Sequence, residues 1–152
     1  MYGEYICVFG ASSDIEDWMQ LVELVKWNFP GMDIPEHRKI VVRNIERKSA
    51  ICVKCSNEIV GILIYSLNHS CISCMAVHPA HRKKGIAVMM IEKMLSVYPE
   101  DMDIWVSTFR EGNSMGAAPR KLYKKMGFIE DELITGHGEY PCQKFVLRRQ
   151  IK

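Results

Sequence analysis

The strongest potential for chemistry lies between Val77 and Ala87, in the segment VHPAHRKKGIA. An apolar run ends at Val77, the basic residues Arg82, Lys83 and Lys84 follow, and Gly85 precedes an uninterrupted helical pattern. Free N–H groups at the first turn of a helix attract an anion, and a glycine lets the backbone come close to a phosphate. The segment therefore predicts a local anion site, although a solvated basic turn would have the same residues.

The nature of that anion is limited by what the sequence lacks. Neither the Gly-x-x-x-x-Gly-Lys-Ser/Thr phosphate loop nor the Gly-x-Gly-x-x-Gly dinucleotide motif occurs, so a nucleoside triphosphate or a nicotinamide cofactor is not the expected ligand. Twenty Lys and Arg residues against eighteen Asp and Glu leave a net charge of only +2. Bulk charge therefore gives no support for a nucleic-acid partner.

Two motifs in the chain are similar to motifs of the GNAT N-acetyltransferase superfamily. Arg82-x-x-Gly85-x-Ala87, preceded by Val77-x-Pro79, resembles the loop that binds the pyrophosphate of acetyl-CoA in this family. The later segment AAPRKLYKKMGF, residues 117–128, resembles the family's short helix with Leu-Tyr, followed by Gly-Phe at the start of a strand. The resemblance covers nearly the whole chain and suggests a generic, bacterial-type, single-domain member.

The resemblance implies a role for each residue that matches these motifs. Backbone amides of six residues would bind the CoA pyrophosphate, namely Arg82, Lys83, Lys84, Gly85, Ile86 and Ala87. Met75 and Val77 would bond the pantetheine arm through their backbone, as a strand bonds an added strand. Tyr123 would protonate the departing CoA thiolate.

The chemistry expected of Tyr123 is plausible, because a phenol with a pKa of about 10 can hydrogen-bond or protonate a thiolate whose conjugate acid is near 8.5. The alternative is that its ring only packs under the sheet. The usual base is missing, since the strand before the loop, Cys71–Val77, contains no carboxylate. Glu111 is a candidate to act through water, or an ordinary surface acid, and the base stays unassigned.

We therefore expect an enzyme that moves an acetyl group from acetyl-CoA directly to a primary amine of a small molecule or peptide, without an acyl-enzyme and without a metal. The resemblance locates the acceptor near residues 27–37, with Asp33 and Glu36, and near residues 135–140, with Glu139. Acids there would suit a cationic amine. One alternative is a GNAT-like module that binds acyl-CoA without catalysis; another is a zinc-stapled binding module.

The zinc alternative depends on two cysteine pairs. Cys52-x-x-Cys55 and Cys71-x-x-Cys74 have a spacing found in structural zinc sites. Both pairs, however, lie inside alternating strand patterns, where residues three apart point to opposite faces. Neither pair would then converge on one metal ion, so no metal ligands are predicted.

The elements that position these residues follow from hydrophobic periodicity. The strands expected from alternation are 5–9, 50–55, 59–66, 71–77, 104–109, 128–134 and 143–148. The helices expected from three- and four-residue spacing are 13–29, 35–47, 85–96 and 120–126, and a capping box of Ser13 and Glu16 opens the first. This order predicts an α/β (α+β) fold with a central mixed, mostly antiparallel, twisted sheet of about seven strands and about four flanking helices.

Composition sets the wider context. A chain of 152 residues, 48% hydrophobic and 25% charged, is expected to form one folded domain over residues 1–152. Its longest apolar run, residues 59–65, is far too short to span a membrane, and its first residues lack the pattern of a secretory signal. We therefore expect a cytoplasmic protein with no membrane partner, whose six cysteines stay reduced. Whether it is a monomer or a homodimer stays open.

Overall fold

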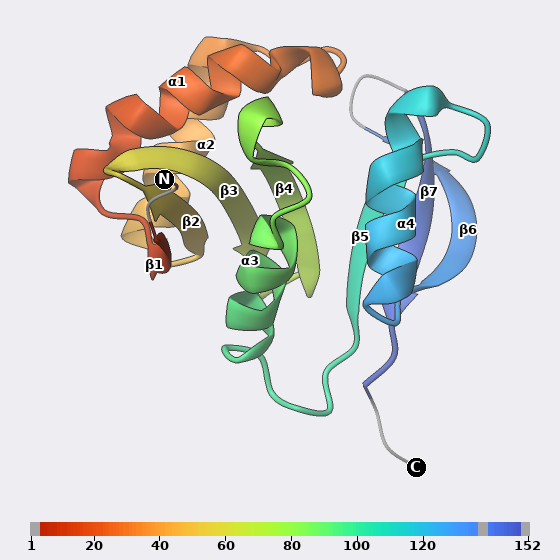
Figure 1. Cartoon of the computed structure of the whole chain (residues 1–152). Coiled ribbons are helices and arrows are strands. Elements are labelled where there is room, and N and C mark those ends of the chain that lie inside the picture. The colour runs from red at the N-terminus through yellow and green to blue at the C-terminus, as the bar shows by residue number, and fades with distance from the viewer. Residues whose placement is uncertain (1–3, 137–139, 150–152) are drawn as a thin grey trace.

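The computed structural model, which describes residues 4–136 and 140–149, has a seven-stranded sheet with helices on both faces (Figure 1). The strands are β1 (Tyr5–Phe9), β2 (Ala50–Cys55), β3 (Glu58–Ser66), β4 (Cys71–Val77), β5 (Ile104–Phe109), β6 (Ile129–Thr135) and β7 (Pro141–Leu147). The helices are α1 (Ile15–Val25), α2 (Ile34–Glu46), α3 (Ile86–Leu95) and α4 (Ala117–Lys125). The predicted α/β fold and its number of strands and helices are confirmed.

The sheet has the strand order β1-β2-β3-β4-β5-β7-β6. All neighbouring strands are antiparallel except β4 and β5, which are parallel. A parallel pair needs a crossover, and α3 provides it between β4 and β5. The sheet is therefore mixed and mostly antiparallel, as the alternation of short runs and tight turns predicted.

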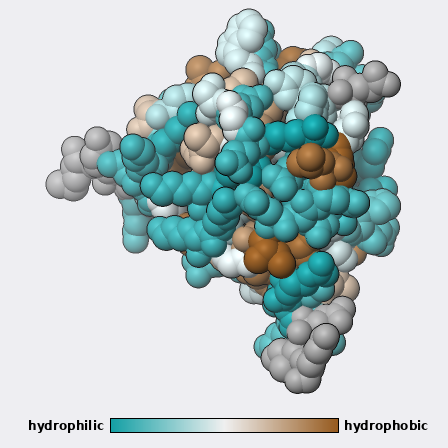
Figure 2. Space-filling view, turned by 90° about the vertical axis from the view of Figure 1, so that its right-hand side faces the viewer, coloured by the Kyte–Doolittle hydropathy of each residue, from teal (hydrophilic) through white to brown (hydrophobic). Residues whose placement is uncertain are grey.

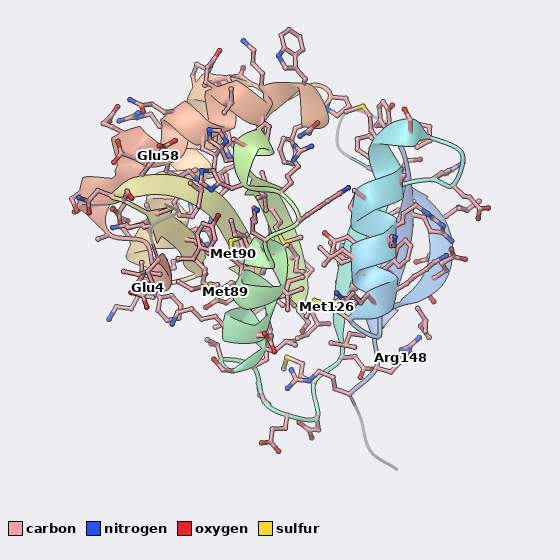
Figure 3. All side chains as sticks on the ribbon, viewed as in Figure 1. Glu4, Glu58, Met89, Met90, Met126 and Arg148 are labelled. Carbon is pink, nitrogen blue, oxygen red and sulfur yellow. The ribbon has the colours of Figure 1, made fainter. Side chains whose placement is uncertain are left out.

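Each face of the sheet has its own hydrophobic core. One core lies under α1 and α2 and includes the fully buried Trp18. The other lies under α3 and α4 and includes Met90 and Met94 of α3. Figure 3 shows Met89 and Met90 on α3 and Met126 directly after α4, on the same side of the sheet.

The start of α1 differs from the prediction. The predicted capping box of Ser13 and Glu16 is wrong: a 3-10 turn occupies residues 12–14, and the Asp14 carboxylate accepts a hydrogen bond from the backbone N–H of Ala11 at 2.8 Å. Glu16 instead forms an ion pair with Arg38 of α2. Helix α1 ends at Val25, before the predicted end, and a second 3-10 turn follows. Local spacing alone did not distinguish Asp14 from its polar neighbours.

Two further elements begin earlier than predicted. Helix α4 begins at Ala117, three residues before its predicted start, and β7 begins at Pro141, two residues before its predicted start. Pro119 lies in the first turn of α4, where a proline costs no intrahelical hydrogen bond. The predicted helix began at Arg120, directly after this proline.

The side of the molecule formed by α4 and β6 is mainly hydrophilic, with small separate hydrophobic patches (Figure 2). Strand β6 is an edge of the sheet and carries two exposed apolar side chains, Ile129 and Leu133. Among the described residues, no helix is both long and apolar enough to cross a membrane.

Candidate active site

The site is organised by the way β4 and β5 separate. The two parallel strands form one residue pair, Cys71 with Trp105. The backbone N–H of Trp105 donates to the backbone carbonyl of Ser70 at 2.9 Å. In contrast, β5 pairs with β7 along its whole length. Figure 1 shows β4 and β5 moving apart from this junction towards their carboxyl ends. The sheet is therefore open between Val77 and Phe109.

The backbone of β4 faces this opening at two predicted positions. The His78 N–H donates to the carbonyl of Val60 at 2.8 Å, and β3 and β4 are paired so that Met75 lies opposite Leu63 and Val77 opposite Gly61. Hydrogen-bonded pairs alternate with non-bonded pairs in an antiparallel ladder. The backbone N–H and C=O groups of Met75 and Val77 consequently point away from β3, towards β5.

The basic loop lies at the N-terminus of α3, directly after the carboxyl end of β4. Its backbone has positive φ angles at Lys83 (61°) and Gly85 (82°), and Gly85 caps the helix without any side-chain hydrogen bond. Arg82, Lys83, Lys84 and Gly85 are exposed, Ala87 is partly buried and Ile86 is buried in the core. Ile86 thus anchors the helix while the first-turn amides have no capping side chain, which is the arrangement that binds anions.

Two histidines, His78 and His81, hold the start of this loop in place. His78 Nδ1 accepts a hydrogen bond from the backbone N–H of Ala80 at 3.0 Å, and its Nε2 lies 3.6 Å from Glu58, which Figure 3 labels near the start of β3. His81 Nδ1 lies 3.0 Å from the Tyr5 hydroxyl of β1. The two imidazole rings meet edge to face, with centroids 5.3 Å apart. Both side chains therefore link the loop to the sheet.

Tyr123 comes from α4, on the same side of the sheet as α3. Its side chain is 4% exposed, and its ring packs against those of Phe128 and Phe145, with centroids 5.5 Å and 6.0 Å away. Burial raises the pKa of the Tyr123 phenol, and the nearby thiol of Cys74 on β4 adds to this shift. The phenol therefore stays protonated at neutral pH.

Sequence reasoning missed Arg120, which lies one turn before Tyr123. Arg120 is 6% exposed, and its guanidinium donates to the Phe109 carbonyl, Gln143 and Glu130. A buried charge is rare unless it is paired. A basic residue three positions before a buried tyrosine, on the same helical face, was the signal available in the sequence.

The remaining predicted acids have structural partners. Glu111 is 85% exposed and lies 3.9 Å from Arg120, at the rim of an open pocket of about 570 Å³ beside α4. Asp33 caps α2 by accepting from the Glu36 N–H at 3.1 Å, and Glu36 pairs with Lys39 at 3.0 Å. Glu139 lies outside the described residues.

The pair Cys52 and Cys55 points to opposite faces of the sheet, as the alternation argument expects. Cys52 belongs to the core under α1 and α2, and Cys55 belongs to the core on the opposite face. All six cysteines are free thiols. Within residues 4–136 and 140–149, no group of three or more His, Cys, Asp and Glu side chains is placed to hold a metal ion.

Comparison with known proteins identifies a family. The model of the acetyltransferase (GNAT) domain matches residues 46–130, more than half of the chain. A comparison with curated proteins gives no match.

Solved structures share the fold along nearly the whole chain. A GNAT-family acetyltransferase from Bacillus cereus ATCC 10987 is 24% identical, with a TM-score of 0.74, over 99% of this chain and 100% of that chain. The ribosomal-protein-S18-alanine N-acetyltransferase of Escherichia coli is 15% identical, with a TM-score of 0.75, over 98% and 96%. The diaminobutyrate acetyltransferase of Paenibacillus lautus, solved with L-2,4-diaminobutyric acid and coenzyme A, is 14% identical, with a TM-score of 0.72, over 99% and 98%.

Proposed function

Because the chain belongs to the GNAT family of acetyltransferases, we propose that it transfers an acetyl group from acetyl-CoA directly to a primary amine of a small molecule or peptide. The observation that carries the proposal is the opening between β4 and β5, which are joined at the Cys71–Trp105 pair. The basic loop before α3 lies on one side of it, and the buried phenol of Tyr123 on α4 lies on the other. An extended thioester fits such an opening, with its phosphates at one end and its reactive carbon within the sheet.

The CoA pyrophosphate binds to backbone amides of Arg82, Lys83, Lys84, Gly85, Ile86 and Ala87. The uncapped first turn of α3 and the positive φ of Gly85 support this role, because both bring N–H groups to the surface of the loop. The side chains of Arg82 and Lys83, both exposed, add positive charge near the phosphates. The Tyr5–His81 hydrogen bond stabilises the base of the loop.

The pantetheine arm pairs with the open edge of β4. The backbone groups of Met75 and Val77 face this edge, where an amide-containing chain would extend the sheet by strand addition. The side chains of both residues pack against the core under α3 and α4, which fixes the edge in place.

Acetyl-CoA supplies a thioester whose carbonyl carbon is attacked by the neutral amine, so that a C–N bond forms, the C–S bond breaks and the nitrogen releases one proton to solvent. Tyr123 donates its phenolic proton to the leaving sulfur and regains a proton from solvent. The raised pKa of Tyr123 keeps the donor protonated before each turnover. The base that neutralises the amine stays unassigned, because β4 contains no carboxylate. The reaction needs no metal ion.

The acceptor is proposed to be an amine because two similar folds belong to enzymes whose names specify amine substrates, the alanine of ribosomal protein S18 and diaminobutyrate. We propose that it approaches from the side formed by α1, α2 and the β6–β7 hairpin. We also propose that residues 1–152 act as one domain in the cytoplasm, where the six free thiols would remain reduced.

The test combines acetyl-CoA calorimetry with an assay of CoA release over a panel of primary amines and N-terminal peptides. We expect acetyl-CoA binding and turnover with at least one amine. Tyr123→Phe should keep the affinity for acetyl-CoA and lose turnover by a factor of about 10² to 10⁴, the usual contribution of a general acid. Unchanged turnover would show that Tyr123 is not the acid.

The matched control is Tyr65→Phe, which removes the hydroxyl of another buried tyrosine, bonded to the Lys48 carbonyl far from the opening. It should keep wild-type turnover. Binding of acetyl-CoA without turnover on any amine would favour the silent acyl-CoA-binding module. Absence of acetyl-CoA binding would refute both the acetyltransferase and the silent module.

A further inference from the structure

Helix α4 is held to the molecule by few buried side chains. It has nine residues, of which two, Arg120 and Tyr123, are buried. They are three positions apart and therefore lie on the same face of the helix. The contacts that fix Arg120 therefore add to the aromatic packing that fixes Tyr123.

Arg120 is bound to three different parts of the sheet. Its Nη1 donates to the carbonyl of Phe109, at the end of β5, at 3.1 Å and to Gln143 Oε1 of β7 at 2.7 Å. Its Nη2 donates to Glu130 Oε1 of β6 at 2.6 Å. Lys124 also pairs with Glu130 at 2.8 Å, and these two cations hold the pKa of that carboxyl below its usual value. Arg120 therefore links α4 to β5, β7 and β6 together.

Arg120 and Tyr123 also share one aromatic neighbour. The guanidinium carbon of Arg120 lies 4.9 Å from the centre of the Phe145 ring, and the Tyr123 ring centre lies 6.0 Å from it. Phe145 is fully buried on β7. A cation over this ring and a phenol beside it fix the rotation of α4 about its axis.

From these contacts we infer that Arg120 is a positioning residue, which sets the depth and rotation of α4 and through them the place of the Tyr123 hydroxyl at the β4–β5 opening. The inference rests on the proposed function, because it gives Arg120 a role only if Tyr123 acts on the thiolate. An apolar side chain could fill the same space, but it would not fix the orientation of α4. The planar guanidinium requires acceptors at set angles, so it specifies one orientation of the helix.

The experiment compares steady-state kinetics of Arg120→Met with the wild type, using acetyl-CoA and the best amine of the panel. A displacement of about 1 Å can cost about a hundredfold in rate. We expect kcat to fall at least tenfold, while the KM for acetyl-CoA stays within about twofold because the loop before α3 is untouched. Arg120→Lys keeps the charge but not the planar fork, and should recover part of the loss.

The decisive measurement is a double-mutant cycle with Tyr123→Phe. If Arg120 acts through the phenol, Arg120→Met costs nothing further once the hydroxyl is gone. Losses that multiply in the double variant would overturn the inference. So would an equal loss in Lys121→Met, the matched control, which removes an exposed cation from the next position of α4.

A second readout needs no amine. In protein labelled with carbon-13 at the tyrosine ring Cζ, the Tyr123 signal, assigned with Tyr123→Phe, should be a single line in the wild type. It should broaden or shift in Arg120→Met and not in Lys121→Met. An unchanged line would overturn the inference.

Failure of this inference can be told apart from failure of the proposed function. If Tyr123→Phe is inactive while Arg120→Met matches the wild type, only the positioning role fails; if Tyr123→Phe is fully active, the acid role fails. Should Arg120→Met not fold, Glu130→Gln replaces it, since the Glu130 side chain is 37% exposed. Glu130→Gln should lower kcat more than Lys124→Met does, and equal losses would overturn the inference.

Discussion

Gly61 and Ile86 lie so close together that a Cβ atom added to Gly61 would stand 2.6 Å from Cγ2 of Ile86. Gly61 is opposite Val77, the last residue of β4, and Ile86 is the first residue of α3. The missing side chain in β3 therefore lets the N-terminus of α3 approach the sheet beside the open edge of β4. This contact sets the distance between the basic loop and the opening.

Replacing Gly61 should disturb both stability and binding. In Gly61→Ala the new methyl group overpacks the core against Ile86 and Met90, which typically costs about 1–3 kcal/mol of unfolding free energy. Because α3 must move outward, the affinity for acetyl-CoA should fall as well. Urea unfolding and calorimetry measure the two effects. Adding Ile86→Ala removes the clashing methyl, so the double variant should lose less than the sum of the single losses; a strictly additive loss would contradict this account.

Gly85 should matter for its backbone conformation rather than for the absence of a side chain from a crowded place. It has a φ of 82°, and a Cβ atom there would meet nothing within 4 Å. Gly85→Ala should therefore cost only the strain of a left-handed residue, about 1–2 kcal/mol, and Gly85→Asn less. The affinity for acetyl-CoA should drop further than stability explains, because the Cβ lies where the backbone is proposed to meet phosphate.

The control for Gly85 is Gly31, which has a φ of 78° and equally open surroundings in the loop between α1 and α2. Gly31→Ala should lose a similar amount of stability in thermal unfolding. Its acetyl-CoA affinity should match the wild type. Equal losses of affinity in the two variants would show that the effect is not local to the loop.

His37 should make the protein less stable in mild acid. The side chain is 8% exposed, its Nε2 has no partner among the described residues, and burial lowers its pKa. The unfolded chain takes up a proton near pH 6.5 and the folded chain resists it. Stability is therefore fully present above about pH 6.5 and decreases below it, by up to about 1.4 kcal/mol per pH unit.

Urea unfolding at several pH values between 7.5 and 5 checks this dependence. His37→Leu should reduce the slope, whereas His69→Gln, at an exposed histidine, should leave it unchanged. A wild-type slope in His37→Leu would mean that other groups are responsible.

Cys52 should make the protein less stable at alkaline pH. Burial, with a smaller contribution from Asp14, raises the pKa of its thiol to about 12. In the unfolded chain the thiol ionises near pH 8.5, so stability is fully present below that pH and is lost as the pH rises towards the folded value. Under reducing conditions, Cys52→Ala should flatten the decline of unfolding free energy between pH 8.5 and 10.5, by up to about 1.4 kcal/mol per pH unit. An unchanged decline would exclude Cys52 as a cause.

Much of the fold was predictable because the signals are local. Strands β2, β3 and β4 alternate or form apolar runs between tight turns, and all three have nearly the predicted bounds. The start of α1 was not predictable, because the Asp14 carboxylate pairs with Lys54 of β2 at 2.7 Å as well as accepting from the Ala11 N–H, and local spacing does not show the distant partner. The single pair between β4 and β5 was also unpredictable, since it depends on how a distant crossover packs.

The site shows the same division. The loop from Arg82 to Ala87 was predictable because its glycine and basic residues are contiguous and precede a helix. Arg120 was missed because its partners Phe109, Glu130 and Gln143 lie on three strands. A periodicity argument assigns a face to a residue but gives no contact across the sheet.

The junction of Cys71 and Trp105 also bears on how the molecule opens in solution. With one residue pair joining β4 to β5, the two parts of the sheet can separate while breaking few hydrogen bonds. Amide hydrogen exchange should therefore reveal two cooperative units, one built on β1–β4 and one on β5–β7, which open at a lower free energy than global unfolding. A ligand bonded to the edge of β4 and packed under α4 would join these units, so acetyl-CoA should slow exchange on both sides of the junction at once.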